Sequence, residues 1–315
     1  EKRSLKNSEF LTIGLWNTRS VKNKTTTCSD YVLDHNMDIL FLVETWLSES
    51  HTVVIGELCP CGFRFLNAPR PSGDNYGGLG VLFKRELKLQ IIPTGFNSVS
   101  FEHTIISDSK SDIYYVLIYR PPPSKGNGFT IPKFMSEFES FLIHVNSLSG
   151  KAILLGDFNF HVDLPTKPEV ARFLGNVEGA GFSKLVNGPT HKHGHTLDLI
   201  LTRPEDNLVQ DCEIGPRLSD HHILSCTLSS EKPVQEVKTF TMRKLDKIDQ
   251  VSYENDLGPQ FRAVMTPAAN VDKLANAYEK SIVAALDSHA PLITQTSKTT
   301  RAKQPWYNSD IHQAR

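Results

Sequence analysis

Residues 151–159 have the sequence KAILLGDFN, an apolar run that ends at a glycine and is followed by two polar residues. The aliphatic stretch 152–155 predicts a buried β-strand. Asp157 and Asn159 follow this strand across Gly156, and polar side chains at strand ends face the loops in which sites are commonly built. Taken alone, Gly-Asp-Phe-Asn is more often only a tight turn. The segment therefore predicts the end of a core strand with a candidate site beside it.

The same pattern of short apolar runs bounded by Gly, Pro, Asp or Ser recurs from residue 10 to about residue 230. We expect strands over residues 11–16, 39–43, 80–83, 87–92, 101–106, 113–119, 152–155, 197–201 and 223–228. Helices are expected over residues 25–36 and over 169–179, where Phe173, Leu174 and Val177 point inward. Many strands with few helices favour a layered α/β sandwich of two packed sheets flanked by helices.

A further helix begins near Pro132, because proline suits the first helical position. Apolar side chains then recur at spacings of three and four, at Phe134, Phe138, Phe141, Val145 and Leu148. Gly150 stands where a left-handed C-terminal cap is expected.

The chain changes character after residue 230. We expect an N-terminal extension over residues 1–9, one domain over 10–230, and a linker with a helical extension over 231–315. Residues 270–290 predict an amphipathic helix, with Leu274, Tyr278, Ile282 and Leu286 on one stripe. The chain opens with Glu1 and stops at Arg315 in a polar stretch, so both ends look cut from a longer protein.

Composition limits the classes of protein to consider. The 315 residues carry a net charge of −1, so DNA binding would depend on a local patch and not on a basic field. Five cysteines are too few and too scattered for a disulfide framework, which favours a reducing compartment. We find no signal peptide and no apolar run long enough to span a bilayer, so no membrane association is expected.

Polar residues stand at the ends of several expected strands. The set consists of Asn17, Glu44, Tyr119, Asp157, Asn159, Asp198, Asp220 and His221. Each has an ordinary structural explanation on its own, although Asp198 is costly inside an apolar strand without a partner. In this order and at these boundaries, the set resembles the endonuclease/exonuclease/phosphatase superfamily. The resemblance covers roughly residues 10–230 and implies the DNase I-like four-layer sandwich of two mixed sheets flanked by helices.

Phosphodiester hydrolysis needs a base for water and positive charge near the phosphate, and histidine and carboxylates with Mg²⁺ suit these needs. By resemblance, His221 is the general base and Asp198 orients it. Glu44 is the principal ligand of Mg²⁺, for which Mn²⁺ is a substitute, with Asn17 and Asp220 near the metal. The same resemblance implies that Asp157 acts on the nucleophilic water or on the leaving group. It also implies that Asn159 and Tyr119 bind the phosphate. Whether Asp157 or His221 takes the proton is open.

One position departs from the superfamily pattern. Apurinic endonucleases commonly carry an acidic residue two places after the Asn17 equivalent, as a further metal contact. Arg19 stands there in this chain. An arginine favours phosphate over metal, which puts a two-metal arrangement in doubt.

Local motifs narrow the resemblance to the endonuclease domains of non-LTR (LINE-type) retrotransposons. These motifs are residues 44–47 (ETWL), 77–81 (GGLGV), 118–122 (IYRPP), 155–159 (LGDFN), 189–191 (PTH), 194–198 (GHTLD) and 219–222 (SDHH). The tail at residues 305–308 is similar to the segment that leads toward a reverse transcriptase. The resemblance implies nicking of one strand of double-stranded DNA in the nucleus, leaving a 3′-hydroxyl that primes reverse transcription. The partners it implies are this DNA and the reverse transcriptase domain of the same polyprotein.

DNA contact should use basic and polar loops near the strand ends. The candidates are Arg19, Lys22, Lys24, Arg120, His195 and Thr196, for which ordinary solvated surface is an equal alternative. His191, His193 and His195 alternate and would share one face of an extended strand. A zinc site there is less favoured than a loop that touches DNA or packs near Asp198, because no cysteine stands nearby.

Two rival functions remain open at this stage. The first is a lipid or sugar-phosphate phosphatase of the same fold, since fold alone does not fix the substrate. The second is a non-catalytic binding module descended from the fold, which the presence of the full residue set disfavours.

Overall fold

The computed structural model describes residues 10–70, 76–108, 111–124, 127–229, 238–264 and 270–297. The chain divides into two compact units, Glu1–Val234 and Gln235–Arg315. The first unit contains all the polar residues that the sequence predicts for the site.

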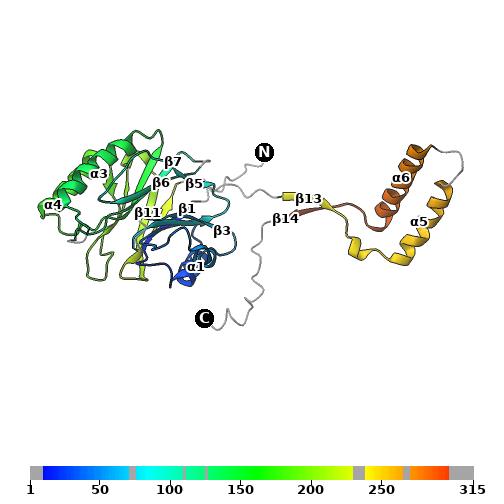
Figure 1. Ribbon diagram of the computed structural model, residues 1–315, viewed down its shortest axis with the longest axis horizontal. Helices are drawn as coiled ribbons and strands as arrows, with labels where there is room; N and C mark the ends of the chain where they lie inside the picture. Colours follow the sequence, from blue (N-terminus) through cyan, green and yellow to red (C-terminus); the bar gives the residue numbers. More distant parts are fainter. Residues whose placement is uncertain are drawn as a thin grey trace, which may run out of the picture. The chain divides into compact units, whose positions relative to one another are not determined.

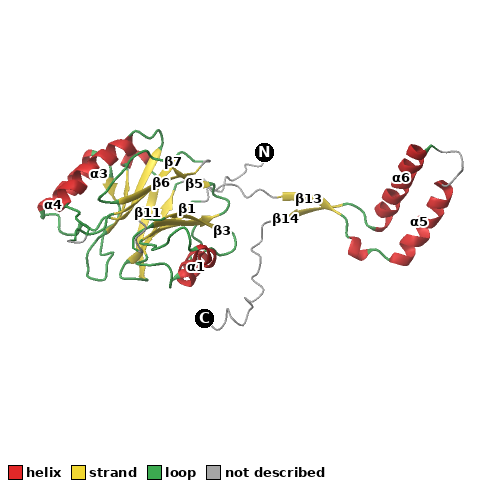
Figure 2. Ribbon diagram, viewed as in Figure 1, coloured by secondary structure: helices red, strands yellow, loops and turns green. Residues whose placement is uncertain are grey.

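The first unit is built on two six-stranded mixed sheets (Figures 1 and 2). The first sheet has the order β11-β12-β1-β2-β4-β3 and consists of β1 (Leu11–Asn17), β2 (Ile39–Val43), β3 (Phe63–Ala68), β4 (Leu79–Lys84), β11 (Val209–Arg217) and β12 (His222–Leu228). The second has the order β5-β6-β7-β8-β10-β9 and consists of β5 (Leu89–Ile92), β6 (Glu102–Asp108), β7 (Ile113–Tyr119), β8 (Lys151–Asp157), β9 (Ser183–Lys184) and β10 (Asp198–Thr202).

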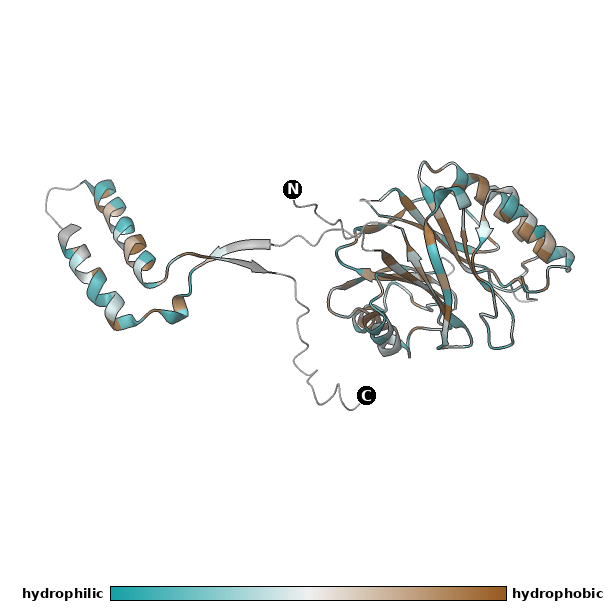
Figure 3. Ribbon diagram, turned by 180° about the vertical axis from the view of Figure 1, so that it is seen from behind, coloured by the Kyte–Doolittle hydropathy of each residue, from teal (hydrophilic) through white to brown (hydrophobic). Residues whose placement is uncertain are grey.

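Helices cover the outer faces of both sheets, so that the unit has four layers. Beside the first sheet lie α1 (Thr25–Asp34) and α2 (Thr52–Leu58), and beside the second lie α3 (Ile131–Asn146) and α4 (Pro168–Gly179). A central cluster that includes Phe41 and Tyr115 fills the space between the sheets. In Figure 3 hydrophobic colour dominates the strands and alternates with hydrophilic colour along the helices, as amphipathic helices require. The predicted four-layer sandwich is confirmed.

Two parallel strand pairs decide where the polar residues meet. β1 pairs with β2 in parallel across α1, and β7 pairs with β8 in parallel across α3. Parallel neighbours end at the same edge of a sheet, so the residues that close these four strands lie at common edges. The antiparallel partners β10 and β12 begin at those edges, since Asp198 pairs with Asp157 and Leu224 pairs with Leu15. The topology therefore gathers residues from distant parts of the sequence.

Most predicted strands and helices agree with the structure to within a few residues, and the strands 39–43 and 113–119 agree at both ends. In the first unit, β3, β9, β11 and α2 were not predicted. β3 and β11 are edge strands whose residues are mostly half-buried or exposed, so they lack a continuous apolar run. The predicted cap at Gly150 is wrong: α3 ends at Asn146 with Ser147 as its cap, and Gly150 instead lies close to the carbonyl of Asp112.

The second unit contains an antiparallel ribbon and a helical hairpin. β13 (Lys238–Met242) pairs with β14 (Ile293–Ser297), and between them lie α5 (Gln250–Val264) and α6 (Val271–His289). Phe261 and Tyr278 stack with ring centroids 4.5 Å apart, and His289 contacts Asp256 at 2.8 Å. The predicted helix 270–290 corresponds to α6, whereas α5 and the ribbon were not predicted. The motif at residues 305–308 lies outside the described residues.

Within the described ranges, none of the helices combines the length and the apolar character needed to cross a bilayer.

Candidate active site

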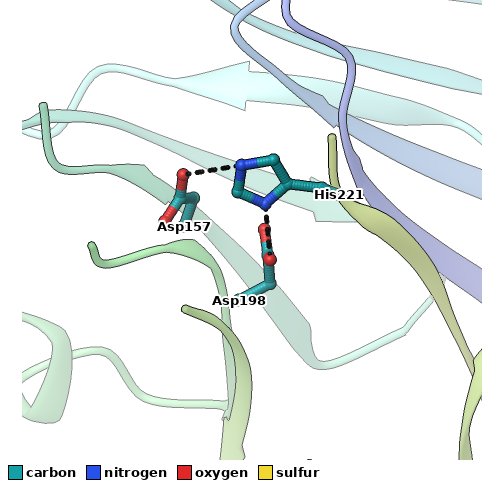
Figure 4. A group of neighbouring side chains, drawn as sticks. All are labelled: Asp157, Asp198 and His221. Atoms are coloured by element: carbon teal, nitrogen blue, oxygen red, sulfur yellow. Dashed lines mark hydrogen bonds and ion pairs between the residues drawn. The ribbon is translucent and has the colours of Figure 1, made fainter. Parts of the chain in front are cut away.

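A histidine lies between two aspartates at the shared strand edges (Figure 4). His221 Nδ1 is 2.8 Å from Asp198 Oδ2, and its Nε2 is 4.0 Å from Asp157 Oδ2. The side chains are nearly sealed from solvent, with exposed fractions of 7% for His221 and 1% for each aspartate. The carboxylate of Asp198 therefore fixes the ring orientation and leaves Nε2 directed toward Asp157.

The charges of this cluster shift its protonation equilibria. Burial by itself lowers the pKa of His221, but the negative charge and hydrogen bond of Asp198, with the charges of Asp157 and Asp220, raise it to about 9. Burial, followed by the charge of Asp198, raises the pKa of the Asp157 carboxyl. The site thus retains protons near neutral pH, and a cation placed beside the carboxylates would favour their release.

Asn17 joins the two sheets at the site. Its side-chain amide donates to Glu44 Oε1 at 2.9 Å and to Asp157 Oδ2 at 2.8 Å. Its own oxygen accepts from the backbone N–H of Arg19 at 3.0 Å. Asn17 is fully buried, so it is the internal partner of two carboxylates from different sheets.

Glu44 follows β2 with a left-handed backbone at a φ of 55°, which is uncommon for a side chain of this size. The backbone is held by the N–H of Ser20, which donates to the carbonyl of Glu44 at 2.8 Å. The Glu44 carboxylate accepts from Trp46 Nε1 at 3.3 Å and also from the hydroxyl of Tyr119. Burial, with the charges of Glu44 and Asp157, raises the pKa of Tyr119, which keeps the phenol protonated as a donor.

The turn after β8 orients the carboxylate of Asp157 through hydrogen bonds from Asn159. The backbone N–H of Asn159 donates to Asp157 Oδ1 at 2.9 Å, and its amide Nδ2 donates to Oδ2 at 3.2 Å. Asn159 has a left-handed φ of 50°. Gly156 is required here, because a Cβ at this residue would overlap the carbonyl of Ile118 on β7.

Asp220 lies beside His221 and pairs with a cation of the chain itself. Its Oδ2 is 3.0 Å from Arg19 Nη1, and Arg19 has a side chain that is 59% exposed. The other oxygen, Oδ1, is buried and has no hydrogen-bond partner. An unpaired buried carboxylate oxygen is costly unless something binds it, so Asp220 Oδ1 is available as a ligand atom.

Two supporting hydroxyl residues were not predicted. Ser219 Oγ donates to the carbonyl of Asn17 at 2.7 Å and accepts from the N–H of His221 at 3.0 Å, which ties the segment before β12 to the end of β1. Thr190 Oγ1 accepts from the N–H of Asp198 at 3.0 Å. Both lie within motifs that carry the resemblance, but a loop hydroxyl has too many ordinary uses for a role to be predicted from sequence.

The residues predicted to contact DNA separate into two groups. Arg19 and Lys22 are exposed, and Lys24 is partly exposed with Nζ bonded to the carbonyl of Ser20 at 3.1 Å. His195 is partly exposed and lies 2.9 Å from Asp163.

Arg120 and Thr196, which are also predicted to contact DNA, are buried, with exposed fractions of 2% and 4%. Thr196 Oγ1 is used internally, since it donates to the carbonyl of Gly188 at 2.5 Å. Both residues are therefore less accessible to a duplex than Arg19 and Lys22 are.

The three alternating histidines do not share a strand face, because Gly194 adopts a left-handed φ of 81° and the chain turns. His191 instead bridges to His221, with ring centroids 4.7 Å apart, and so packs beside the site. His195 packs against His161, with ring centroids 3.9 Å apart and the ring planes tilted by 32°. In the described part of the chain, these histidines belong to no group of three potential metal ligands within 4.8 Å of one another.

Asp157, Asp198 and His221 do form such a group, with ligand atoms within 4.8 Å. The hydrogen bond between His221 and Asp198 uses one atom of each, so the trio suits proton transfer better than metal binding. Glu44, Asp157 and Asp220 carry the carboxylate oxygens that a hard divalent cation such as Mg²⁺ prefers, but in the described part of the chain these three residues do not form a group with ligand atoms within 4.8 Å of one another. The unpartnered Asp220 Oδ1 fits the same interpretation.

Comparisons with known proteins show the family of the chain. Residues 14–221 match the Endonuclease/Exonuclease/phosphatase family. A curated relative, the RNA-directed DNA polymerase from mobile element jockey of Drosophila melanogaster, is 25% identical over 150 residues, which is 47% of this chain and 15% of that protein. The chain therefore matches only a small part of that relative's length.

Similar solved structures include the endonuclease domain of TRAS1, a telomere-specific non-LTR retrotransposon, with a TM-score of 0.54 at 12% identity over 70% of this chain and 98% of that one. The AP endonuclease LMAP from Leishmania major has a TM-score of 0.55 at 16% identity over 70% of this chain and 88% of that one. At these identities the structures support the fold. The family match covers most of the first unit and includes its polar cluster, so the chain belongs to the endonuclease/exonuclease/phosphatase family of hydrolytic phosphodiesterases.

Proposed function

We propose that this chain is a Mg²⁺-dependent DNA endonuclease from a non-LTR retrotransposon polyprotein, which nicks one strand of its target to leave a 3′-hydroxyl primer for reverse transcription. The observation that carries the proposal is a chain of contacts: Asp198 is hydrogen-bonded to His221, Nε2 of His221 lies 4.0 Å from Asp157, and Asp157 and Glu44 both accept from the amide of Asn17. The jockey and TRAS1 similarities support a retrotransposon origin.

The metal would be held by Glu44 and Asp220, with Asn17 and Asp157 beside it. When bound, Mg²⁺ supplies positive charge that offsets charge developing on the phosphate oxygens. Arg19 adds a second positive charge at this edge, 3.0 Å from Asp220. This arrangement favours one bound metal with an arginine where related enzymes use a further acidic residue.

Asp157 and His221 act as one unit for the proton of the attacking water. Their facing atoms are 4.0 Å apart, and the pKa of each is raised, so the proton belongs to the pair and not to either residue alone. Asp198 holds the Nδ1 side of the ring and stabilises the imidazolium form. The imidazolium can then donate to a phosphate oxygen.

Tyr119 and Asn159 would hold the phosphate. Tyr119 keeps its proton at neutral pH and can turn its hydroxyl from Glu44 toward a phosphate oxygen. Asn159 donates from its amide on the same side as Asp157. Each donor has a partner within the protein, Glu44 for Tyr119 and Asp157 with the Arg120 carbonyl for Asn159, and would exchange it for a phosphate oxygen.

Arg19, Lys22, Lys24 and His195 would contact the sugar–phosphate backbone of double-stranded DNA near the site. Such contacts fix register and orientation without reading sequence. The proposed partner beyond DNA is the reverse transcriptase domain of the same polyprotein, and the proposed place of action is the nucleus.

Supercoiled plasmid tests the proposal directly. With Mg²⁺, the purified chain should convert it to open circles whose nicks are extended by a DNA polymerase without prior end treatment. His221→Ala and Asp157→Ala should each abolish nicking, whereas His222→Ala, in a neighbouring histidine bonded to Gly215 O at 2.9 Å, should retain it. Intact plasmid together with hydrolysis of phosphoinositides would instead identify a lipid phosphatase.

A further inference from the structure

Arg120, the residue after β7, is buried with its charge enclosed by the protein. Its guanidinium lies over two aromatic rings, with Cζ 3.9 Å from the centroid of Phe160 and 4.9 Å from that of Phe134. Nη1 donates to the carbonyls of Phe158 at 3.1 Å and Asn159 at 3.0 Å. A charge at this depth is stable only where such partners replace water.

The backbone of Arg120 contacts the same turn. Its N–H donates to the carbonyl of Asp157 at 2.9 Å, and its carbonyl accepts from Asn159 Nδ2 at 2.8 Å. Asn159 has the left-handed φ of 50°, a conformation that costs free energy unless its surroundings stabilise it. Side chain and backbone of Arg120 therefore converge on the turn formed by Asp157, Phe158 and Asn159.

That turn sets the place of the Asp157 carboxylate, because Asn159 donates to both of its oxygens. We propose that Arg120 is a positioning residue, which holds this turn so that Asp157 stays beside His221, and that it makes no contact with DNA. The inference rests on the proposed function for its reaction.

An arginine that contacts a DNA phosphate and an arginine that positions a reacting group affect different kinetic parameters. A phosphate contact contributes to DNA affinity and to its salt dependence, with a slope of about −0.9 for each phosphate neutralised. A positioning residue acts on the reacting groups, where a displacement of about 1 Å can cost on the order of 100-fold in rate. Lysine keeps the charge but loses the planar group that bonds two carbonyls over a ring.

Arg120→Lys therefore separates the roles. We expect kcat for plasmid nicking to fall about tenfold or more, with KM and the salt slope of DNA binding unchanged. Hydrolysis of bis(4-nitrophenyl) phosphate, a small diester without a duplex, should slow by a similar factor. Unchanged kcat on both substrates, or a raised KM for plasmid with a smaller salt slope, overturns the proposal.

Arg203→Lys is the matched control. Arg203 also lies over a ring, 5.0 Å from that of Phe182, and donates to Asn146 Oδ1 at 2.8 Å. It follows the end of β10 that is opposite Asp198, so its variant should lower the melting temperature and leave kcat unchanged. Phe160→Leu removes one of the rings that Arg120 lies over and should also lower kcat. This second variant tests the proposal if Arg120→Lys fails to fold.

The outcomes also separate this inference from the proposed function. A wild-type chain that cleaves the small diester but never nicks plasmid overturns the DNA function alone. The effect of Arg120→Lys is then measured as kcat for hydrolysis of the small diester. A wild-type chain inactive on both substrates overturns both proposals.

Discussion

Asn17 at the end of β1 and Asp157 at the end of β8 are hydrogen-bonded across the two sheets, with the Asn17 amide 2.8 Å from the Asp157 carboxylate. The same amide donates to Glu44, so one buried side chain sets the separation of the proposed metal ligand from the proposed proton acceptor. This relationship makes the sandwich a rigid frame for chemistry that involves both sheets.

Replacing Asn17 with Asp should stop nicking. The substitution removes two donors and places a third carboxylate between Glu44 and Asp157, where like charges repel. We expect at least a 100-fold fall in kcat and a loss of about 1–3 kcal/mol in unfolding free energy. Asn146→Asp is the control, because its amide donates to Ala180 O in an exposed position. Plasmid nicking and urea denaturation measure the two effects, and retained turnover in Asn17→Asp contradicts the bridging role.

Replacing Asp198 with Asn should disable His221 without removing it. An amide that donates to Nδ1 forces the proton of the neutral ring onto Nε2, the atom that faces Asp157. Comparable changes in His–Asp pairs lower kcat by roughly 10⁴-fold, and we expect a loss of similar order. Single-turnover nicking measures it. Thermal unfolding should remain cooperative, and a variant with kcat within tenfold of wild type would remove Asp198 from the mechanism.

Replacing Glu44 with Gln should weaken metal binding. The neutral amide keeps the size of the side chain but loses the charge that a hard divalent cation needs. The Mg²⁺ concentration for half-maximal nicking should rise about tenfold or more, since losses of this size accompany even outer-shell changes at metal sites. Glu49→Gln, in an exposed residue of the same loop, should leave the titration unchanged. Identical titrations for both variants would rule out Glu44 as a ligand.

The sequence was sufficient for the core strands and for the strand-end residues, because both depend on local pattern. Strands such as β2 and β7 are continuous apolar runs, and Glu44, Tyr119 and Asp157 stand where those runs stop. Edge strands such as β11 were missed because their half-exposed residues do not alternate cleanly.

Local sequence patterns did not predict the contacts between segments that are distant in the sequence. Arg120 looks like a basic loop residue in the sequence, but rings from α3 and from the turn after β8 enclose it. The bond from Ser219 to the Asn17 carbonyl joins segments 202 residues apart, and nothing local predicts it. Burial of polar residues is thus the property that sequence reasoning misjudged here.

The free energy of unfolding should decrease in mild acid because of His103. This residue lies on β6, and its Nδ1 is hydrogen-bonded to Ser98 Oγ at 3.0 Å. Burial, followed by the positive charge of His144, lowers the pKa of His103 from 6.5 to about 4. Above pH 6.5 the ring is neutral in both states and its contribution is complete. As pH falls from 6.5 toward 4, the unfolded chain binds a proton that the folded chain does not, so unfolding becomes easier.

The corresponding loss is on the order of 3 kcal/mol at most, from about 1.4 kcal/mol per unit of pKa, and partial exposure of the ring reduces it. In His103→Gln this proton linkage is absent, so the slope of unfolding free energy against pH should be shallower between pH 6.5 and 4. Urea denaturation at half-unit steps gives the slope, and the difference at pH 7.5 measures the packing effect of the substitution separately. Parallel curves for the two chains would show that His103 is protonated equally in the folded and unfolded states.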